Sequence, residues 1–347
     1  MARGDDTAVH RSELTVDLGA LRRNVRTLLR VLDGAELWAV AKADAYGHGA
    51  VDVSRAALDA GATTLCVVTA EEALELRSAF PEGRILCMGP VEPLDVVRLR
   101  EARVELAVSA GELPEGVRVH VKLDTGMGRF GVSKLAAPSR DVVGLMSHLA
   151  TADSDPAFAE RQLERFDQLT REHAHLTRHV ANSAAALRIP RARYDAARCG
   201  IALYGLSPFG EDPAVDGLEP VLSWRSHLAQ VKRLDPGEST GYGRLFVAEQ
   251  PTWIGLVPVG YADGFRRDLT GTRVRVGDDP CRVIGTISMD SFAVELDREL
   301  PVGTPVTLLG DGASAEAHAR VAATINYELV SRISSDARRA ARVVAGG

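Results

Sequence analysis

The chain is organised around the stretch Val40-Ala41-Lys42-Ala43-Asp44-Ala45-Tyr46-Gly47-His48-Gly49. The apolar residues 37–41 predict a buried strand, and Lys42 follows at the carboxyl end of that strand. Asp44, Gly47 and Gly49 are typical of a turn, and a helical pattern begins near Val51. A lysine that ends a buried strand loses hydration, which lowers its pKa and suits it to Schiff-base formation.

Composition limits the class of protein and its partners. The 347 residues are enough for two domains, and 46% hydrophobic with 25% charged residues is typical of a soluble globular protein. The net charge of −6 argues against a nucleic-acid partner. No stretch approaches the ~18 apolar residues needed to span a membrane. The polar residues 1–6 contain no apolar secretion signal, which predicts a cytoplasmic location.

Short apolar strands alternate with helical patterns over the first 220 residues. Strands are predicted at residues 37–41, 64–68, 84–88, 103–108, 117–123, 141–147, 177–181 and 197–204. Helices are predicted near residues 18–31, 50–60, 70–79, 93–101 and 157–174. This alternation favours an N-terminal TIM-type (β/α)8 barrel over residues 11–220, with its chemistry at the carboxyl ends of the strands. An open doubly wound sheet is the alternative, but the first strand lacks a Gly-x-Gly-x-x-Gly turn after it.

Two connections of this barrel are too short for regular crossovers. Only eight residues lie between Val108 and Val117, whereas a parallel crossover usually needs a dozen or more. The link from Asp124 to Arg140 is rich in glycine and proline. The sequence therefore predicts a barrel with two shortened crossover connections.

From residue 221 to residue 347 the pattern changes to a mostly β domain. Strands are predicted at residues 221–234, 252–259, 273–276, 281–288, 292–296 and 305–309. A helix is predicted over residues 315–325, and the basic end, residues 337–347, is expected to fray. Residues 13–17 alternate like a strand, and the segment 11–17 is a candidate for pairing with this β domain.

The stretch that contains Lys42 resembles the cofactor-lysine motif of the alanine racemases, and the resemblance extends over nearly the whole chain. It implies pyridoxal 5'-phosphate as the cofactor, Lys42 as the lysine that holds it, and Tyr46 beside its phosphate. The short connections depart from the family pattern, because family members usually carry helices at both places.

A glycine-rich loop, residues 122–131, follows another predicted strand. Its Arg129 can present a planar fork to a carboxylate. The resemblance implies that Arg129 helps to bind the substrate carboxylate, and that Lys122 is a candidate for carbamylation. A carbamylated lysine is an anion and can accept a hydrogen bond from the arginine.

Further polar residues stand at the ends of later predicted strands. Ser183 would stand at a helix start, where free amides attract phosphate, and Arg198 in its apolar run needs a partner for its charge. The resemblance implies that Arg198 faces the pyridine nitrogen of the cofactor. It also implies cofactor contacts for the residues His148, Asn182, Ser183, Gly200 and Ile201.

Three residues of the second domain complete the implied site. Tyr261, in a Gly-Tyr-Ala-Asp-Gly segment, matches the second catalytic base of the family. Met289 matches the residue whose backbone amide binds the substrate carboxylate, although Ser288 stands where a cysteine is usual. Tyr327 matches a tyrosine near the phosphate. No metal site is expected, because His173, His175 and His179 lack a carboxylate or thiol at ligand spacing.

The resemblance therefore implies interconversion of L- and D-alanine by two bases, Lys42 and Tyr261, which would supply D-alanine for cell-wall peptidoglycan. The resemblance further implies a homodimer whose active sites are shared between subunits. A barrel-type decarboxylase of amino acids, a racemase of broader or different substrate range, and a non-enzymatic pyridoxal-phosphate carrier remain alternatives. The Ala-Tyr-Gly-His-Gly stretch and Tyr261 argue against the decarboxylase.

Overall fold

A computed structural model of the chain describes residues 10–135 and 138–346. The chain divides into two compact units. Residues 18–219 form the barrel unit, and the first strand together with the residues from 220 onward forms the β unit.

The barrel unit is built on eight parallel strands in the order β8-β7-β6-β5-β4-β3-β2-β9. Their bounds are β2 (Glu36–Val40), β3 (Thr64–Val67), β4 (Ile85–Cys87), β5 (Glu105–Val108), β6 (Val119–Lys122), β7 (Val142–Met146), β8 (Thr177–His179) and β9 (Ala196–Cys199). The end strands approach each other, because the N–H of Arg198 donates to the carbonyl of Ala181 over 2.9 Å. The predicted barrel is confirmed, with its strands at the expected places, except that the strand predicted over residues 197–204 ends at Cys199, because the chain turns from Gly200 onward with the N–H of Leu203 donating to the carbonyl of Gly200.

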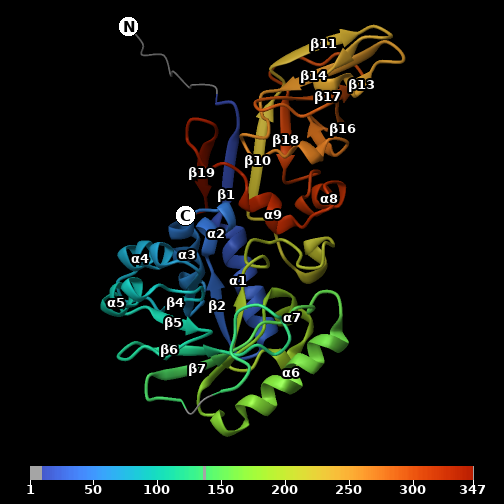
Figure 1. Ribbon diagram of the computed structural model, residues 1–347. Helices are drawn as coiled ribbons and strands as arrows, with labels where there is room; N and C mark the ends of the chain where they lie inside the picture. Colours follow the sequence, from blue (N-terminus) through green and yellow to red (C-terminus); the bar gives the residue numbers. More distant parts are fainter. Residues whose placement is uncertain (1–9, 136–137, 347) are drawn as a thin grey trace, which may run out of the picture. The chain divides into compact units, whose positions relative to one another are not determined.

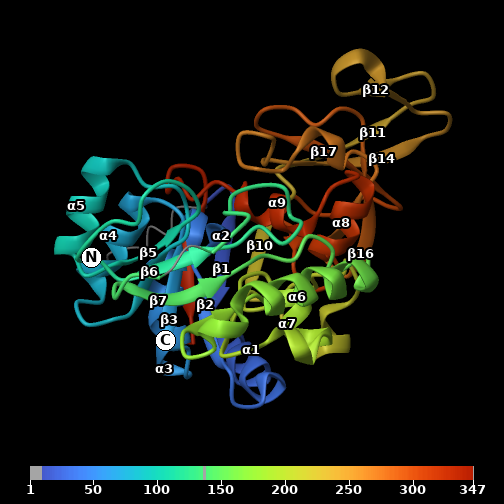
Figure 2. The same ribbon diagram turned by 60° about the horizontal axis from the view of Figure 1, so that its bottom comes forward.

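Helices lie outside these strands (Figures 1 and 2). Those of eight residues or more are α1 (Leu18–Leu32), α3 (Ala50–Asp59), α4 (Ala70–Ala79), α5 (Pro93–Glu101) and α6 (Pro156–Thr170). Two short ones, α2 (Lys42–Gly47) and α7 (Ser183–Arg188), follow β2 and β8 directly. Along α1 an apolar stripe is buried, with Leu21, Val25 and Leu28 fully covered.

The two shortened crossovers are present. Residues 109–118, between β5 and β6, contain no helix, and neither do the described parts of the next connection, residues 123–135 and 138–141. The second connection instead folds back on β6, because the N–H of Val132 donates to the carbonyl of Lys122 over 2.9 Å. Figure 1 shows β5, β6 and β7 joined by loops. The loop that carries Arg129 is thereby held beside the end of β6.

The β unit contains a nine-stranded sheet in the order β11-β14-β17-β16-β15-β18-β10-β1-β19. Its strands are β1 (Glu13–Asp17), β10 (Leu222–His227), β11 (Gln230–Leu234), β14 (Thr252–Val257), β15 (Arg273–Val276), β16 (Asp279–Ile284), β17 (Phe292–Leu296), β18 (Pro305–Leu309) and β19 (Ala341–Ala345). A hairpin of β12 (Ser239–Thr240) and β13 (Phe246–Val247) and two helices, α8 (Ala315–Val321) and α9 (Asn326–Ser331), complete it. The first strand of the chain pairs with β10, as considered for residues 11–17.

Three expectations for this unit are wrong. The predicted strand 221–234 is interrupted at Leu228 and Ala229, so that β10 pairs with β18 and β11 pairs with β14. The predicted helix 315–325 ends at Val321, because Ala323 takes a left-handed conformation (φ 49°) and the N–H of Thr324 folds back to the carbonyl of Ala319.

The third correction concerns the end of the chain. Residues 341–345 do not fray but form β19, which pairs in parallel with β1. The β-branched side chains of Val343 and Val344 suit a strand, and the edge of β1 supplies its backbone partners. In the whole part of the chain that the structure describes, no helix is long and apolar enough to cross a membrane.

Candidate active site

Lys42 stands where β2 ends and is followed by an uncommon backbone conformation. Residues 43–46 all have φ between 51° and 54°, so that they form one left-handed helical turn without a glycine. Such a conformation costs roughly 1–2 kcal/mol for each residue with a side chain. Strain of this kind persists only where surrounding contacts impose it, and it is concentrated at functional sites.

Contacts from elsewhere in the barrel unit hold this turn. The carboxylate of Glu72, which also caps α4, accepts the N–H of Ala43 over 2.7 Å. The carboxylate of Asp44 accepts the N–H of Ala50 over 2.7 Å, which ties the turn to the start of α3. The turn after Lys42 is therefore fixed at both ends, and Lys42 itself is held at the mouth of the barrel strands.

Positive charges gather around Lys42. Burial and the nearby charge of Arg129 lower the pKa of Lys42, although Glu72 opposes the shift. Burial, Arg129, Arg198 and Lys42 lower the pKa of Lys122 to about 8. The Nζ atoms of both lysines have no hydrogen-bond acceptor within residues 10–135 and 138–346. This part of the barrel is suited to anionic ligands and to an amine that reacts in its neutral form.

His148 lies within the same group of cations. Burial and the charges of Arg198, Arg129 and the two lysines lower the pKa of His148 to about 3. Its Nδ1 atom lies 3.4 Å from a terminal nitrogen of Arg198. His148 is therefore a neutral imidazole at physiological pH, and it is suited to packing and hydrogen bonding rather than to carrying charge.

Arg198, on β9, is buried and held by the ends of neighbouring strands. Its two terminal nitrogens donate to the carbonyls of His179 and Ser147, each over 2.7 Å. Burial lowers the pKa of Arg198 to about 10, which still leaves it charged at neutral pH. No carboxylate of the described residues contacts the guanidinium, so the compensation of its charge must come through intermediate groups.

Two buried histidines connect Arg198 to a carboxylate. The guanidinium contacts Nδ1 of His179 at 2.7 Å, Nε2 of His179 contacts Nδ1 of His120 at 2.9 Å, and Nε2 of His120 contacts Glu105 at 2.8 Å. An arginine can only donate and a carboxylate can only accept, so each imidazole is neutral and protonated on Nε2. Burial lowers the pKa of both histidines, which agrees with this assignment.

The relay from Arg198 to Glu105 was not predicted from the sequence. Burial alone would raise the pKa of Glu105, but the hydrogen bond from His120 and the charges of Arg84 and Arg118 lower it. A period of two along β6 places His120 and Lys122 on one face of a fully buried strand. This alternation is the signal in the sequence that points to the relay, because buried polar side chains in a strand need hydrogen-bond partners.

A second group of predicted residues lies around Gly200. A Cβ atom added to Gly200 would lie only 2.5 Å from the hydroxyl of Tyr46, so the tyrosine ring packs directly on this glycine. The hydroxyl oxygen of Ser183 accepts the N–H of Gly200 over 3.0 Å. Ile201 is buried next to them, and Asn182 caps α7 by accepting the N–H of Ala185. The hydroxyls of Tyr46 and Ser183 therefore both lie against Gly200, beside the left-handed turn.

The remaining predicted residues belong to the β unit. Tyr261 and Met289 lie on adjacent turns, joined by hydrogen bonds from the N–H of Tyr261 to the carbonyl of Ser288 and from that of Ala262 to Met289. Their side chains are 42% and 53% exposed. No acceptor for the N–H of Met289 is found in the described part of the chain. Tyr327 is the second residue of α9.

Comparison with known proteins agrees with these observations. The family model for the alanine racemase N-terminal domain matches residues 16–208, and the model for the C-terminal domain matches residues 221–341. The alanine racemase of Lactiplantibacillus plantarum is 39% identical over 352 aligned positions, which cover 92% of this chain and 94% of the relative. That of Streptomyces coelicolor is 40% identical, with 96% of both chains covered.

Solved structures extend the likeness to three dimensions. The alanine racemase from Streptomyces coelicolor A3(2) has a TM-score of 0.90 and 38% identity, with 99% of this chain and 100% of that chain covered. The alanine racemase from Bacillus anthracis, solved with bound L-Ala-P, has a TM-score of 0.86 and 34% identity, with coverage of 96% and 95%. The chain therefore belongs to the alanine racemase family, and it is an isomerase that interconverts the two enantiomers of alanine.

Proposed function

We propose that this chain racemises alanine with pyridoxal 5'-phosphate, and that Lys42 and Tyr261 are the two bases. The observation that carries the proposal is the state of Lys42. Its amine stands at the end of β2, has a lowered pKa and has no acceptor among the described residues. An amine in that state is a nucleophile toward an aldehyde and a base toward a carbon acid.

The residues of the barrel unit fit this cofactor. The hydroxyls of Tyr46 and Ser183 and the amide of Ile201 would supply neutral donors, and the Gly200 amide would join them by exchanging the Ser183 oxygen for the phosphate. The close approach of Tyr46 to Gly200 leaves no room for a side chain there. These residues would hold the phosphate, with Tyr327 as a further contact and Asn182 and His148 beside the ring. When bound, the cofactor withdraws electron density from the α-carbon of an attached amino acid.

Arg198 would face the pyridine nitrogen of the cofactor. Its main-chain contacts fix the guanidinium, and a pKa of about 10 keeps it charged at neutral pH. A charged arginine donates a hydrogen bond without giving up its proton. The ring would therefore stay unprotonated and withdraw electrons moderately, which limits competing reactions.

Racemisation needs a proton taken from one face of the α-carbon and a proton returned to the other. Lys42 serves one face, and the phenol of Tyr261 serves the other. The exposed side chain of Tyr261 and the N–H of Met289, which has no acceptor among the described residues, lie together on the β unit. The phenol of Tyr261 is suited to transferring the proton, and the amide of Met289 is suited to binding the substrate carboxylate.

Arg129 would bind the same substrate carboxylate from the barrel side. Its own side chain needs support, because Arg129 lies on an exposed loop. A carbamate on Lys122 would supply an acceptor, and the lowered pKa of Lys122 favours the neutral amine that reacts with carbon dioxide. Carbamylation would also remove one positive charge from this crowded group of cations, which favours the reaction.

We further propose a homodimer in which Lys42 and Tyr261 of one site come from different subunits. Variants Lys42→Ala and Tyr261→Phe, each inactive alone, are unfolded together and reassembled. Mixed dimers with shared sites contain one intact site, so activity returns; verified mixed dimers without activity would contradict the shared site. A cytoplasmic location and a supply of D-alanine to the cell wall stay predictions.

Borohydride reduction with peptide mapping tests the cofactor assignment. The pyridoxyl group is expected on the peptide that contains Lys42. A label on Lys122, Lys134 or Lys232 would overturn the assignment. A panel of amino acids analysed by chiral chromatography then distinguishes a racemase specific for alanine from one with a broader range, and a decarboxylase would instead release carbon dioxide.

A further inference from the structure

Two turns of the β unit that carry proposed functional residues are packed closely together. The tyrosine turn (residues 258–264) and the methionine turn (residues 286–291) share the two backbone hydrogen bonds described above. A Cβ atom added to Gly260 would lie 2.3 Å from the carbonyl oxygen of Ser288. Only glycine permits this approach, so the backbones of the two turns lie in direct contact.

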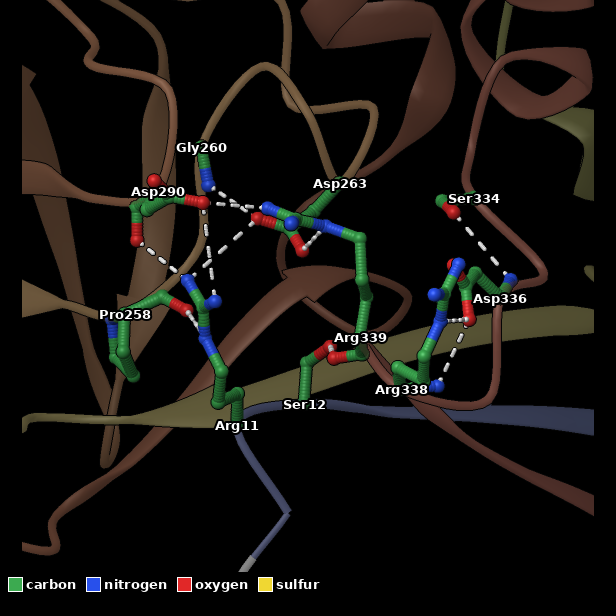
Figure 3. A network of polar contacts seen from close by, with 10 residues as sticks. All are labelled: Arg11, Ser12, Pro258, Gly260, Asp263, Asp290, Ser334, Asp336, Arg338 and Arg339. Carbon is green, nitrogen blue, oxygen red and sulfur yellow. Dashed lines mark hydrogen bonds and ion pairs between the residues drawn. The ribbon is translucent and has the colours of Figure 1, made fainter.

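One arginine bridges the two turns. The Nε atom of Arg339 donates to Asp263 on the tyrosine turn over 2.8 Å, and its terminal nitrogen donates to Asp290 on the methionine turn over 2.6 Å (Figure 3). The Asp263 side chain is only 3% exposed, and its second oxygen accepts the N–H of Gly260 over 2.8 Å. A carboxylate so buried requires a cationic partner; Arg339 supplies the nearer one at 2.8 Å, and Arg11 supplies a second at 3.9 Å.

A second arginine supports the same contacts from the other end of the chain. Arg11 donates to the carbonyl of Pro258 over 3.1 Å and to the carbonyl of Asp290 over 2.8 Å. Arg11 precedes β1 and Arg339 precedes β19, and these two strands pair with each other. The two ends of the described chain therefore hold the two turns from one side, as Figure 3 shows.

We propose that Arg339 is a positioning residue, which fixes the Tyr261 phenol and the Met289 amide relative to each other by bridging Asp263 and Asp290. The inference rests on the proposed roles of Tyr261 and Met289. Both side chains are about half exposed, so packing within the β unit holds them weakly. The backbone of the turns is what determines their positions, and the bridge by Arg339 fixes that backbone.

The neighbouring residue provides a matched control. The Arg338 side chain is 88% exposed, and within the described part of the chain its hydrogen bonds and ion pair all go to Asp336, two residues away (Figure 3). Arg338→Ala removes the same charge from the same segment without touching either turn. In hydrogen-exchange mass spectrometry, Arg339→Ala should speed amide exchange in residues 258–264 and 286–291 by about tenfold or more, the size expected when charged hydrogen bonds are lost. Arg338→Ala should leave exchange there unchanged.

The second measurement tests the function of the tyrosine turn by comparing inversion with exchange of the α-proton. In heavy water, one enantiomer of alanine exchanges its α-proton through Lys42 alone, whereas inversion needs Tyr261 as well. Arg339→Ala should therefore slow inversion about tenfold or more while exchange at that enantiomer stays within about twofold, because only one base is displaced. If Arg339→Ala does not fold, Arg339→Lys replaces it, since one ammonium cannot hold both carboxylates as the fork does.

Equal behaviour of the Arg339 and Arg338 variants in either measurement would overturn the positioning role. Tyr261→Phe is measured alongside and should also slow inversion more than exchange. If Tyr261→Phe changes this ratio and the Arg339 variant does not, only the positioning role fails. If Tyr261→Phe leaves the ratio unchanged, the proposed base itself is wrong, and the inference that rests on it fails too.

Discussion

Glu105→Gln tests whether the buried relay behind Arg198 depends on its terminal charge. In the native chain, Glu105 is the carboxylate that accepts hydrogen bonds from His120, Arg84 and Arg118. Glutamine has the same shape but no charge, and its NH2 group is a donor. This NH2 group must therefore face either a histidine N–H or an arginine N–H, and both of those groups are donors as well.

The expected cost follows from the burial of the pair. Removal of one partner of a buried ion pair costs roughly 3–5 kcal/mol. The Arg84 side chain is 27% exposed, so water relieves part of the loss and the lower end of that range applies. For a unit of about 200 residues, about 3 kcal/mol corresponds to a fall in Tm of roughly 6–12 °C.

The control is Arg118→Gln, which removes the exposed partner of the same carboxylate. The Arg118 side chain is 62% exposed, and exposed ion pairs contribute about 0–1 kcal/mol. Thermal unfolding followed by circular dichroism gives the two Tm values. Nitrogen-15 NMR of the histidines reads the protonated ring nitrogen directly, which is Nε2 for both His179 and His120 in the native relay.

A large fall in Tm is therefore expected for Glu105→Gln and only a small one for Arg118→Gln, and the histidine tautomers show whether the glutamine oxygen still accepts the His120 N–H. A Tm for Glu105→Gln within about 2 °C of the Arg118→Gln value, with both histidines still protonated on Nε2, would refute the expected role of the Glu105 charge. The relay would then be sustained by packing, and the charge of Arg198 would be tolerated without compensation.

Three further results are expected. While its amine is not carbamylated, Lys122 has a pKa lowered from 10.5 to about 8 by burial and nearby cations, so it binds fewer protons in the folded protein than in the unfolded chain between these values. Lys122 should therefore contribute a rise in stability with pH across that window of at most roughly 3 kcal/mol, and Lys122→Met should remove that contribution in urea unfolding. Ala43→Gly should not lower the unfolding free energy, whereas the same change inside a right-handed helix costs about 1 kcal/mol; a loss of that size would contradict the strained turn. Gly200→Ala should weaken cofactor binding about tenfold or more in a fluorescence titration, because the added Cβ atom would displace Tyr46. Unchanged binding would show that Tyr46 does not contact the phosphate.

The apolar pattern predicted most of the barrel because each strand is buried as a local run. Residues 64–67 and 196–199 are buried throughout, as expected for parallel strands covered on both faces. The short connections were also predictable, since chain length alone forbids a helical crossover between Val108 and Val117. The proposed site residues came from motifs that stand next to these strands.

Other features depend on contacts between distant residues and have no local signal. The left-handed turn at residues 43–46 contains no glycine, and it is imposed partly by Glu72. The end of the chain looks like a fraying tail until β1, more than 300 residues away, supplies its pairing edge. The bridge by Arg339 is equally long-range, because it joins Asp263 and Asp290 from the segment before β19.

The transfer of hydrogen during inversion tests the two-base account most directly. Alanine of one configuration is incubated with the protein and pyridoxal 5'-phosphate in heavy water, and the first product of opposite configuration is separated by chiral chromatography. If Lys42 and Tyr261 act on opposite faces, the product carries solvent deuterium at its α-carbon, because the group that adds the proton is not the one that removed it. Inverted alanine that retains its original proton would show a single base and would contradict the account.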